Sequence, residues 1–314
     1  MPHIVNIGSI NIDYVYKVEH FLRAGETLQA ARRNVFMGGK GLNQSVAVAR
    51  SGLSVRHVGV LGGDGQFLYD FLKDSGVDIT YLRLDPEKAC GHTVIQVTPD
   101  GENAILYFPG TNHSVDAALV ESALSDCDGE DIVLLQNEVN DVGHIIGQAR
   151  AKGLKIVFNP APFSARVLEY PLDAVDVIVL NETEAMGMLQ TKQASSDHQS
   201  IVGMLHERFP QALIILTTGS RGLNYVTPGG EFGALAAYPM KAVDTTGAGD
   251  TFVGYAMRAI AHYLKHADKA AFEKLLHEAV AAAGLSVTRE GAVNSIPPRE
   301  EVARFLAEIS QRKF

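Results

Sequence analysis

The stretch Val243-Asp-Thr-Thr-Gly-Ala-Gly-Asp-Thr-Phe252 joins a glycine-rich turn to the start of a predicted helix. From Phe252 onward the apolar residues follow the i, i+3, i+4, i+7 spacing of one buried helix face. The Gly-Ala-Gly turn therefore lies at a helix N-terminus, where free backbone N–H groups and the positive end of the helix dipole attract anions. Glycines in such a turn let a phosphate approach the backbone closely.

Asp250 follows this turn directly, and two interpretations are open. It could be only an N-cap or first-turn acid, which is the common role of an aspartate at a helix start. It could instead be a general base that takes a hydroxyl proton while the turn stabilises a transferring phosphoryl group. Spacing alone does not choose between them.

A second glycine-rich turn, Phe36-Met-Gly-Gly-Lys-Gly-Leu-Asn-Gln-Ser45, opens another predicted helix, which ends at Gly52. It brings Lys40, Asn43 and several backbone N–H groups to one place. The turn lacks the Walker A spacing, and the chain has no Gly-x-Gly-x-x-Gly, which counts against a nicotinamide-dependent oxidoreductase.

Short β-branched runs alternate with helix-period segments, which predicts an α/β fold with a mostly parallel sheet and helices on both faces. The predicted strands are Ile4–Ile7, Val55–Val60, Asp131–Leu135, Lys155–Phe158, Val175–Leu180 and Leu213–Leu216. The predicted helices include Leu42–Arg50, Val142–Ala151 and Ile201–Phe209.

Two segments, 12–36 and 90–108, break this alternation. In the second, Thr93–Val97 and Ala104–Phe108 flank a Pro-Asp-Gly-Glu turn and predict a hairpin. Together the two segments predict a small second sheet within a single domain that spans 1–314. Residues 190–200 are predicted to form a surface connection.

Composition narrows the class of protein. The chain has 314 residues, 46% of them hydrophobic, and a net charge of -9, so nucleic acid is not an expected partner. Two cysteines are too few for a disulfide framework or a zinc site. No apolar run is long enough to span a membrane, and the N-terminus does not have the pattern of a signal peptide. We expect a cytoplasmic protein.

Polar residues follow several of the predicted strands. In an open α/β sheet the loops at the carboxyl ends of the strands converge on the ligand crevice, so these residues are expected to share one site. They are Asn11 and Asp13 after the first strand, Glu138, the segment Asn181-Glu-Thr-Glu184, and the segment Thr217-Thr-Gly-Ser-Arg-Gly222.

The motifs together resemble the ribokinase-type carbohydrate kinases, the family also called PfkB. The resemblance covers essentially the whole chain, in the family's order. It rests on Gly8-Ser-Ile-Asn-Ile-Asp13, Gly38-Gly-Lys-Gly-Leu-Asn43, Asn159-Pro-Ala-Pro162, Asn181-Glu-Thr-Glu184, Thr218-Gly-Ser-Arg-Gly222 and Asp244-Thr-Thr-Gly-Ala-Gly-Asp250. It implies a Rossmann-like domain with a small β-sheet lid, and ATP-dependent phosphorylation of a sugar hydroxyl.

The resemblance also assigns roles to residues. Asp250 would be the catalytic base, with Gly247, Ala248 and Gly249 as the anion hole. The sugar would be held by Asn11, Asp13, Gly39, Lys40, Asn43 and Glu138, together with Asp250. The nucleotide would meet Asn181, Thr217, Thr218, Gly219, Ser220, Arg221, Gly222 and Gly249.

Two cations are implied in the same way. Glu184 would hold Mg²⁺ through water, although Asn181-Glu-Thr-Glu could equally be a helix-capping segment. K⁺ would be coordinated by oxygens of Asp244, Thr246, Ser286, Arg289, Gly291 and Ser295, for which ordinary turn chemistry is the alternative.

Departures from the family pattern fall where the substrates are recognised. Val280 stands where several ribokinases carry a polar residue against adenine, Phe108–Ser114 departs from the usual wording beside the lid, and Asn137 precedes Glu138 where an apolar residue is common. Ribose, phosphorylated on O5, is the leading expectation, with fructose, another pentose, a deoxy sugar or a nucleoside still open. A sugar-binding protein without catalysis is the rival class. The lid also predicts pairing into a homodimer.

Overall fold

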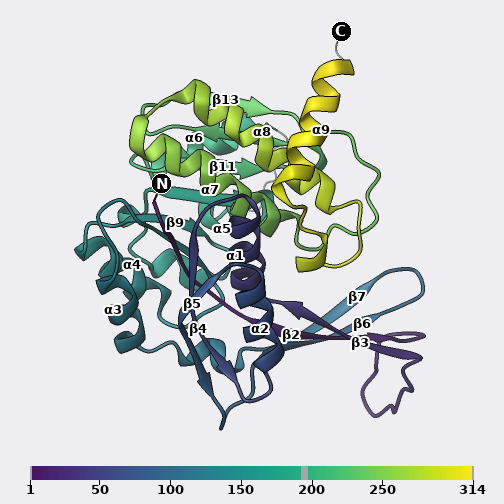
Figure 1. Cartoon of the computed structure of the whole chain (residues 1–314). Coiled ribbons are helices and arrows are strands. Elements are labelled where there is room, and N and C mark those ends of the chain that lie inside the picture. Colours follow the sequence, from purple (N-terminus) through teal and green to yellow (C-terminus); the bar gives the residue numbers. More distant parts are fainter. Residues whose placement is uncertain (1, 192–196, 313–314) are drawn as a thin grey trace.

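The computed structural model describes residues 2–191 and 197–312. Over these residues the chain forms a nine-stranded sheet covered by helices and a separate four-stranded sheet (Figure 1). Figure 1 shows the small sheet projecting from the body of the molecule. This is the α/β fold with a β-sheet lid that the sequence predicts.

The elements have the following bounds. The strands are β1 Ile4–Ile7, β2 Asn11–Lys17, β3 Arg32–Gly38, β4 Val55–Gly62, β5 Asp78–Asp85, β6 Gly91–Val97, β7 Asn103–Phe108, β8 Ile132–Gln136, β9 Lys155–Asn159, β10 Val177–Asn181, β11 Leu213–Thr217, β12 Leu223–Val226 and β13 Phe232–Leu235. The α-helices are α1 Lys40–Arg50, α2 Gln66–Asp74, α3 Ala117–Ser125, α4 Val142–Ala151, α5 Glu182–Leu189, α6 His198–Arg208, α7 Ala248–His266, α8 Lys269–Ser286 and α9 Arg299–Arg312. Short 3₁₀ turns are η1 Gly110–Ser114, η2 Ala165–Glu169, η3 Leu172–Ala174, η4 Gly219–Arg221 and η5 Val293–Ser295.

The large sheet has the order β13-β12-β11-β10-β9-β8-β1-β4-β5. Its strands are parallel from β11 to β5, whereas β12 pairs antiparallel with both β11 and β13. From β1 the chain adds β4 on one side, and β8 is later added on the other. This reversal of direction beside β1 is the topological switch point, where ligands bind in open α/β sheets.

Successive residues of the buried strands enter two different cores. Ile4 packs with the core that contains α1, α2, α7, α8 and α9, whereas Val5 and Ile7 pack with the core of α3 to α6. The same alternation runs through β8, β10 and β11. Because both faces are covered, these strands are apolar at nearly every position, which made them recognisable in the sequence.

The lid is a mixed sheet of order β3-β2-β6-β7. The chain leaves β1 into β2, pairs β2 antiparallel with β3, and returns to the body at α1. The hairpin β6–β7 then adds to β2 in parallel. The roots of the lid therefore lie beside the carboxyl end of β1 and the N-terminus of α1.

The expected elements are confirmed with shifts of at most three residues at their ends. One expectation is wrong in part: α6 begins at His198, so 198–200 are helical and do not belong to a surface connection. The central part of that connection, 192–196, lies outside the described residues. Among the helices that the structure describes, none is both long and apolar enough to cross a membrane.

Candidate active site

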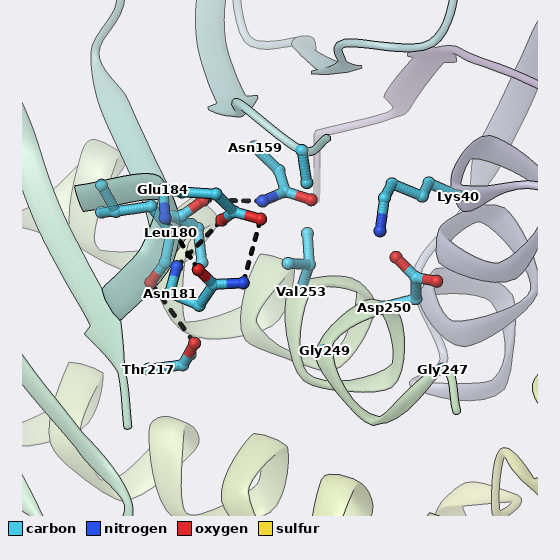
Figure 2. Close-up of a pocket in the computed structure, with 12 residues that line it drawn as sticks. Lys40, Asn159, Leu180, Asn181, Glu184, Thr217, Gly247, Gly249, Asp250 and Val253 are labelled. Atoms are coloured by element: carbon cyan, nitrogen blue, oxygen red, sulfur yellow. Dashed lines mark hydrogen bonds between the residues drawn. The ribbon is translucent and has the colours of Figure 1, made fainter. Parts of the chain in front are cut away.

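A cavity of about 220 Å³ opens at the carboxyl ends of β9, β10 and β11, facing the N-termini of α1 and α7 (Figure 2). It is lined by Lys40, Asn159, Ala161, Val179, Leu180, Asn181, Glu184, Thr217, Gly247, Gly249, Asp250 and Val253. Many of the residues predicted from the sequence to bind the nucleotide or to take part in catalysis therefore line this cavity.

Asp250 is buried in the first turn of α7 and is held by two neighbouring amides of α1. Asn43 Nδ2 donates to its Oδ2, and Gln44 Nε2 donates to its Oδ1, each at 2.9 Å. Both carboxylate oxygens are thus held by neutral side-chain amides. The carboxylate also faces the cavity, and its hydrogen bonds go to side chains of α1.

The approach of α7 to α1 depends on Gly254, one turn after Asp250. A Cβ at this position would lie 2.3 Å from Cβ of Ala47 and 2.9 Å from the carbonyl oxygen of Gln44. Real Cβ atoms do not approach other atoms so closely, so the two helices would have to separate. Gly254 therefore brings Asp250 within hydrogen-bonding range of α1.

The turn before α7, predicted to bind an anion, lies at the wall of the cavity. Gly247, the residue at the N-cap, has φ of 75°, a left-handed conformation that favours glycine. Gly247 and Gly249 line the cavity, and first-turn N–H groups have no partner within their own helix. The N–H of Ala248, however, points to the carbonyl of Thr245 at 3.3 Å, so it is the least available of the predicted donors.

Lys40 supplies positive charge on the same side of the cavity as Asp250. Figure 2 shows its amine next to the Asp250 carboxylate, with Asn181 and Glu184 on the other side. The Asp250 carboxylate raises the pKa of Lys40, against the opposing effect of burial, and Glu138 and Glu184 add to the increase. Lys40 is therefore a protonated cation among carboxylates, a suitable neighbour for a phosphate group.

The residues predicted to bind the sugar lie next to the cavity, around the N-terminus of α1. Glu138 accepts hydrogen bonds from Ser9 Oγ and, at 3.0 Å, from the N–H of Lys40. Burial raises the pKa of Glu138, although the charge of Lys40 opposes this effect. The links through Lys40 make the group around Glu138 continuous with the cavity.

Asp13 and Asn11 lie on β2, at the root of the lid. Asp13 accepts from Thr93 Oγ1 at 2.5 Å, and burial raises its pKa while this hydrogen bond opposes the increase. Asn11 is buried and accepts from Asn112 Nδ2 at 2.7 Å. Gly39 follows β3 with φ of 94° and forms the N-cap of α1. The structure thus brings all the residues predicted to bind the sugar to one end of the large sheet.

Four residues of this region are absent from the sequence-based predictions. Asn112 ties Asn11 to the N–H of Ile10, Thr93 holds Asp13, and Gln44 and Asn159 are hydrogen-bonded beside Asp250. All four stand in stretches of the sequence named above, but none of them was assigned a role. Asn137 instead turns to the carbonyl of Pro162 and the hydroxyl of Tyr170, so its own polar atoms are already satisfied.

Asn181 and Glu184 form a complete capping box at the start of α5. Asn181 Oδ1 accepts from the N–H of Glu184 at 2.9 Å, and Glu184 accepts from the N–H of Asn181 at 2.9 Å and from its Nδ2 at 3.0 Å. Burial raises the pKa of Glu184. The capping interpretation is therefore confirmed, and because the box also lines the cavity, a contact with a ligand stays a prediction. Both oxygens of Glu184 are occupied, which fits a contact to Mg²⁺ through water better than direct coordination.

The predicted nucleotide loop follows β11. Thr217 lines the cavity, whereas Thr218 is buried and bonds to Gly222 O through its N–H at 2.8 Å and its hydroxyl at 3.0 Å. Gly219 and Ser220 are exposed at the tip. Arg221 points away to Glu182, with N–O distances of 2.7 and 2.8 Å, so its side chain takes part in a surface ion pair.

The residues predicted to hold K⁺ flank the turn that leads into α7. Asp244 accepts from the N–H groups of Thr246 and Gly291, each at 2.9 Å. Burial, the largest single effect, would raise the pKa of Asp244, but these hydrogen bonds together lower it. Ser286 and Ser295 donate their hydroxyls to carbonyls of their own turns, and the guanidinium of Arg289 is paired with Glu301. The available atoms are oxygens, which suits a hard cation.

The residue pattern and the geometry agree with comparisons to known proteins. A family model described as pfkB family carbohydrate kinase matches residues 1–299. The chain belongs to this family of carbohydrate kinases. It is therefore a phosphotransferase, as the sequence motifs predicted.

Relatives of this carbohydrate kinase include ribokinases and deoxyribokinases. A Haemophilus influenzae ribokinase is 33% identical over 308 residues, covering 96% of this chain and 97% of the relative. A Salmonella typhi deoxyribokinase is 30% identical over 311 residues, covering 97% and 98%. The structure of Arabidopsis thaliana ribokinase complexed with ribose and ATP has a TM-score of 0.83 at 27% identity, covering 97% of this chain and 98% of that one.

Proposed function

We propose that this carbohydrate kinase transfers the γ-phosphoryl group of ATP to a primary hydroxyl of a sugar, with ribose as the favoured substrate and O5 as the acceptor. The observation that carries the proposal is the placement of Asp250. Its carboxylate is fixed by Asn43 and Gln44 at the N-terminal end of α7. The free N–H groups of this end of the helix and the amine of Lys40 face the same cavity.

In the proposed reaction Asp250 accepts the proton of the sugar hydroxyl as that oxygen attacks the γ-phosphorus. The new oxygen–phosphorus bond forms while the bond to the bridging oxygen of ADP breaks. Charge on the transferring group is stabilised by the N–H groups of Gly247 and Gly249 and by the amine of Lys40. Holding both reactants in one closed site supplies much of the rate gain by proximity, and excluding water limits hydrolysis of ATP.

Two cations are part of this proposal. Mg²⁺, when bound, would neutralise phosphate charge, and the residue suited to orient it through water is Glu184. K⁺ would be held by oxygens of Asp244 and the neighbouring turns, next to the start of α7. In this arrangement the protein itself fixes the anion-binding turn, and the ion would stiffen it.

Ribose is favoured by the relatives named as ribokinases, including the one whose structure contains ribose. The cluster of Asn11, Asp13 and Glu138 supports a polyol, because carboxylates and amides pair with vicinal hydroxyls. A deoxyribokinase is nearly as similar, so the hydroxyl at C2 is the feature on which the substrates would differ. Fructose, another sugar or a nucleoside is the alternative.

We also propose that the kinase forms a homodimer through its lid. The lid exposes several large apolar side chains, and a second copy would cover them. They are Val35, Phe36, Ile105, Leu106 and Phe108. Light scattering coupled to size exclusion would give twice the chain mass; a monomer at micromolar concentration would contradict this part.

The experiment for the activity is ADP formation with Mg·ATP and K⁺ over ribose, 2-deoxyribose, fructose, other pentoses and hexoses, and nucleosides. ADP formation that requires ribose, with the product phosphorylated on O5, supports the proposal. A marked preference for another acceptor would change the proposed substrate but leave the proposed kinase reaction in place. Sugar binding without any ADP formation would favour the non-catalytic alternative.

A further inference from the structure

Gln44 is a fully buried residue of α1 whose side-chain amide nitrogen and oxygen are both hydrogen-bonded within the protein. Its Nε2 donates to Asp250 Oδ1 at 2.9 Å and to Asn159 Oδ1 at 3.0 Å. Its Oε1 accepts from Gln136 Nε2 at 2.7 Å. Both N–H bonds and the carbonyl of this one side chain are therefore used inside the protein.

Backbone carbonyls fix the direction of each of these hydrogen bonds. Asn159 Nδ2 donates to the carbonyl of Val179 at 2.9 Å, so its Oδ1 must be the atom that faces Gln44. From the other side, Asn6 Nδ2 donates to the carbonyl of Gly41 at 2.8 Å, and its Oδ1 accepts from Gln136 at 2.9 Å. Gln44 can present only its NH₂ to Asp250, since a reversed amide would oppose two acceptors.

Asn43, the neighbouring residue, differs from Gln44 in one respect. It also donates to Asp250, but its Oδ1 is buried and has no partner among the described residues. An unsatisfied buried acceptor is costly unless a ligand supplies a donor, and a sugar hydroxyl is such a donor. Asn43 therefore has an atom left for substrate, and Gln44 has none.

We propose that Gln44 is a positioning residue, which orients the carboxylate of Asp250 for proton removal without touching the sugar. The inference rests on the proposed role of Asp250 as the base. Gln44 connects α1, β8 and β9 to Asp250 through Gln136 and Asn159, so the carboxylate is aligned with the framework of the sheet. A side chain without the NH₂ group would leave Asp250 Oδ1 without this donor, so the carboxylate could rotate away from its productive orientation.

The test replaces Gln44 by Met, which keeps length and volume but cannot donate. We expect kcat to fall about 10- to 100-fold, with the KM for sugar within about threefold of wild type. Asn43→Leu removes both a donor to Asp250 and the acceptor left for substrate, so it should lower kcat and also raise the KM for sugar, a rise that Gln44→Met should not show. Ser51→Ala, which removes a buried hydroxyl at the C-cap of the same helix, is the control and should leave kcat within about twofold.

A double-mutant cycle separates positioning from general damage. In an Asp250→Asn background, Gln44→Met should change the residual turnover by less than about twofold, because a residue that acts through the base has nothing left to align. An equal loss in both backgrounds, or a rise in KM without a fall in kcat, would overturn the inference. If Asp250→Asn itself retains full turnover, the proposed function fails instead. Should Gln44→Met not fold, Gln136→Met gives the same comparison, with an expected loss of about 3- to 10-fold in the wild-type background only.

Discussion

The side chains of Asn43 and Asp250 are joined by a hydrogen bond of 2.9 Å, although 207 residues separate them in the chain. The bond links the first turns of α1 and α7, the two helices that begin in glycine-rich turns. This hydrogen bond forms only if the two helices pack closely. The position of Asp250 therefore depends on the close contact one turn away, at Gly254.

Gly254→Ala should therefore lower both stability and activity. In an open helix position this change stabilises by roughly 0.5–1 kcal/mol, but here the new Cβ would overlap Ala47. We expect a net loss of about 1–2 kcal/mol in the free energy of unfolding, and a fall in kcat as Asp250 moves away from α1. Chemical denaturation and steady-state kinetics measure the two effects.

Gly147 is the matched control for this change. It lies within α4, and a Cβ there would meet no atom within 4 Å. Gly147→Ala should stabilise the protein by about 0.5–1 kcal/mol and leave kcat unchanged. Equal behaviour of the two alanine variants would show that the close approach at Gly254 does not position the base.

A second prediction concerns pH and His57, which is fully buried. Burial lowers the pKa of His57 from 6.5 to about 4, against the hydrogen bond to Gly8 O, so the folded protein keeps it neutral. The unfolded chain binds this proton more readily between these values, so stability falls as pH drops from 6.5 toward 4. The expected loss is about 3 kcal/mol.

The measurement is the free energy of unfolding against pH for the wild type and His57→Gln. The variant should be less stable at pH 7 but should lose less stability than the wild type over this window. The same change at an exposed position, His113→Gln, is the control for removing a histidine. Parallel slopes for the wild type and His57→Gln would contradict the prediction.

A third prediction concerns the monovalent cation. Replacing K⁺ by a large organic cation should lower kcat of the wild type, because an ion beside Asp244 would order the turn that leads to Gly247. Asp244→Ala, which also removes the acceptor of the Thr246 and Gly291 N–H groups, should have a lower kcat that no longer responds to K⁺. A full K⁺ response in this variant would place the ion elsewhere.

The fold could be predicted because its signals are local. Strands such as β10, buried on both faces, form short apolar runs, and the hairpin of β6 and β7 has a Pro-Asp-Gly-Glu turn. Exact ends depend on tertiary contacts: β10 begins two residues later than predicted. The beginning of α6 at His198 was missed because polar residues conceal it, and its N-cap, Asp197, is also a common loop residue.

The site was only partly predictable, because some of its contacts are long-range. Asp250 and Lys40 follow glycine-rich turns and could be found from the sequence. Gln44 has no such signal, since whether it faces Asp250 depends on the distance between α1 and α7. Arg221 shows the converse: its motif predicts a ligand contact, but Glu182, brought near by the pairing of β10 with β11, binds its guanidinium.

The most direct test of the central claim is the rate of ribose-dependent ADP formation by Asp250→Asn. Asparagine keeps the size of the side chain but cannot accept the hydroxyl proton. The account predicts that kcat falls about 10²- to 10⁴-fold while ribose, measured by calorimetry, still binds. Turnover within a few-fold of wild type, with ribose bound normally, would show that Asp250 is not the base.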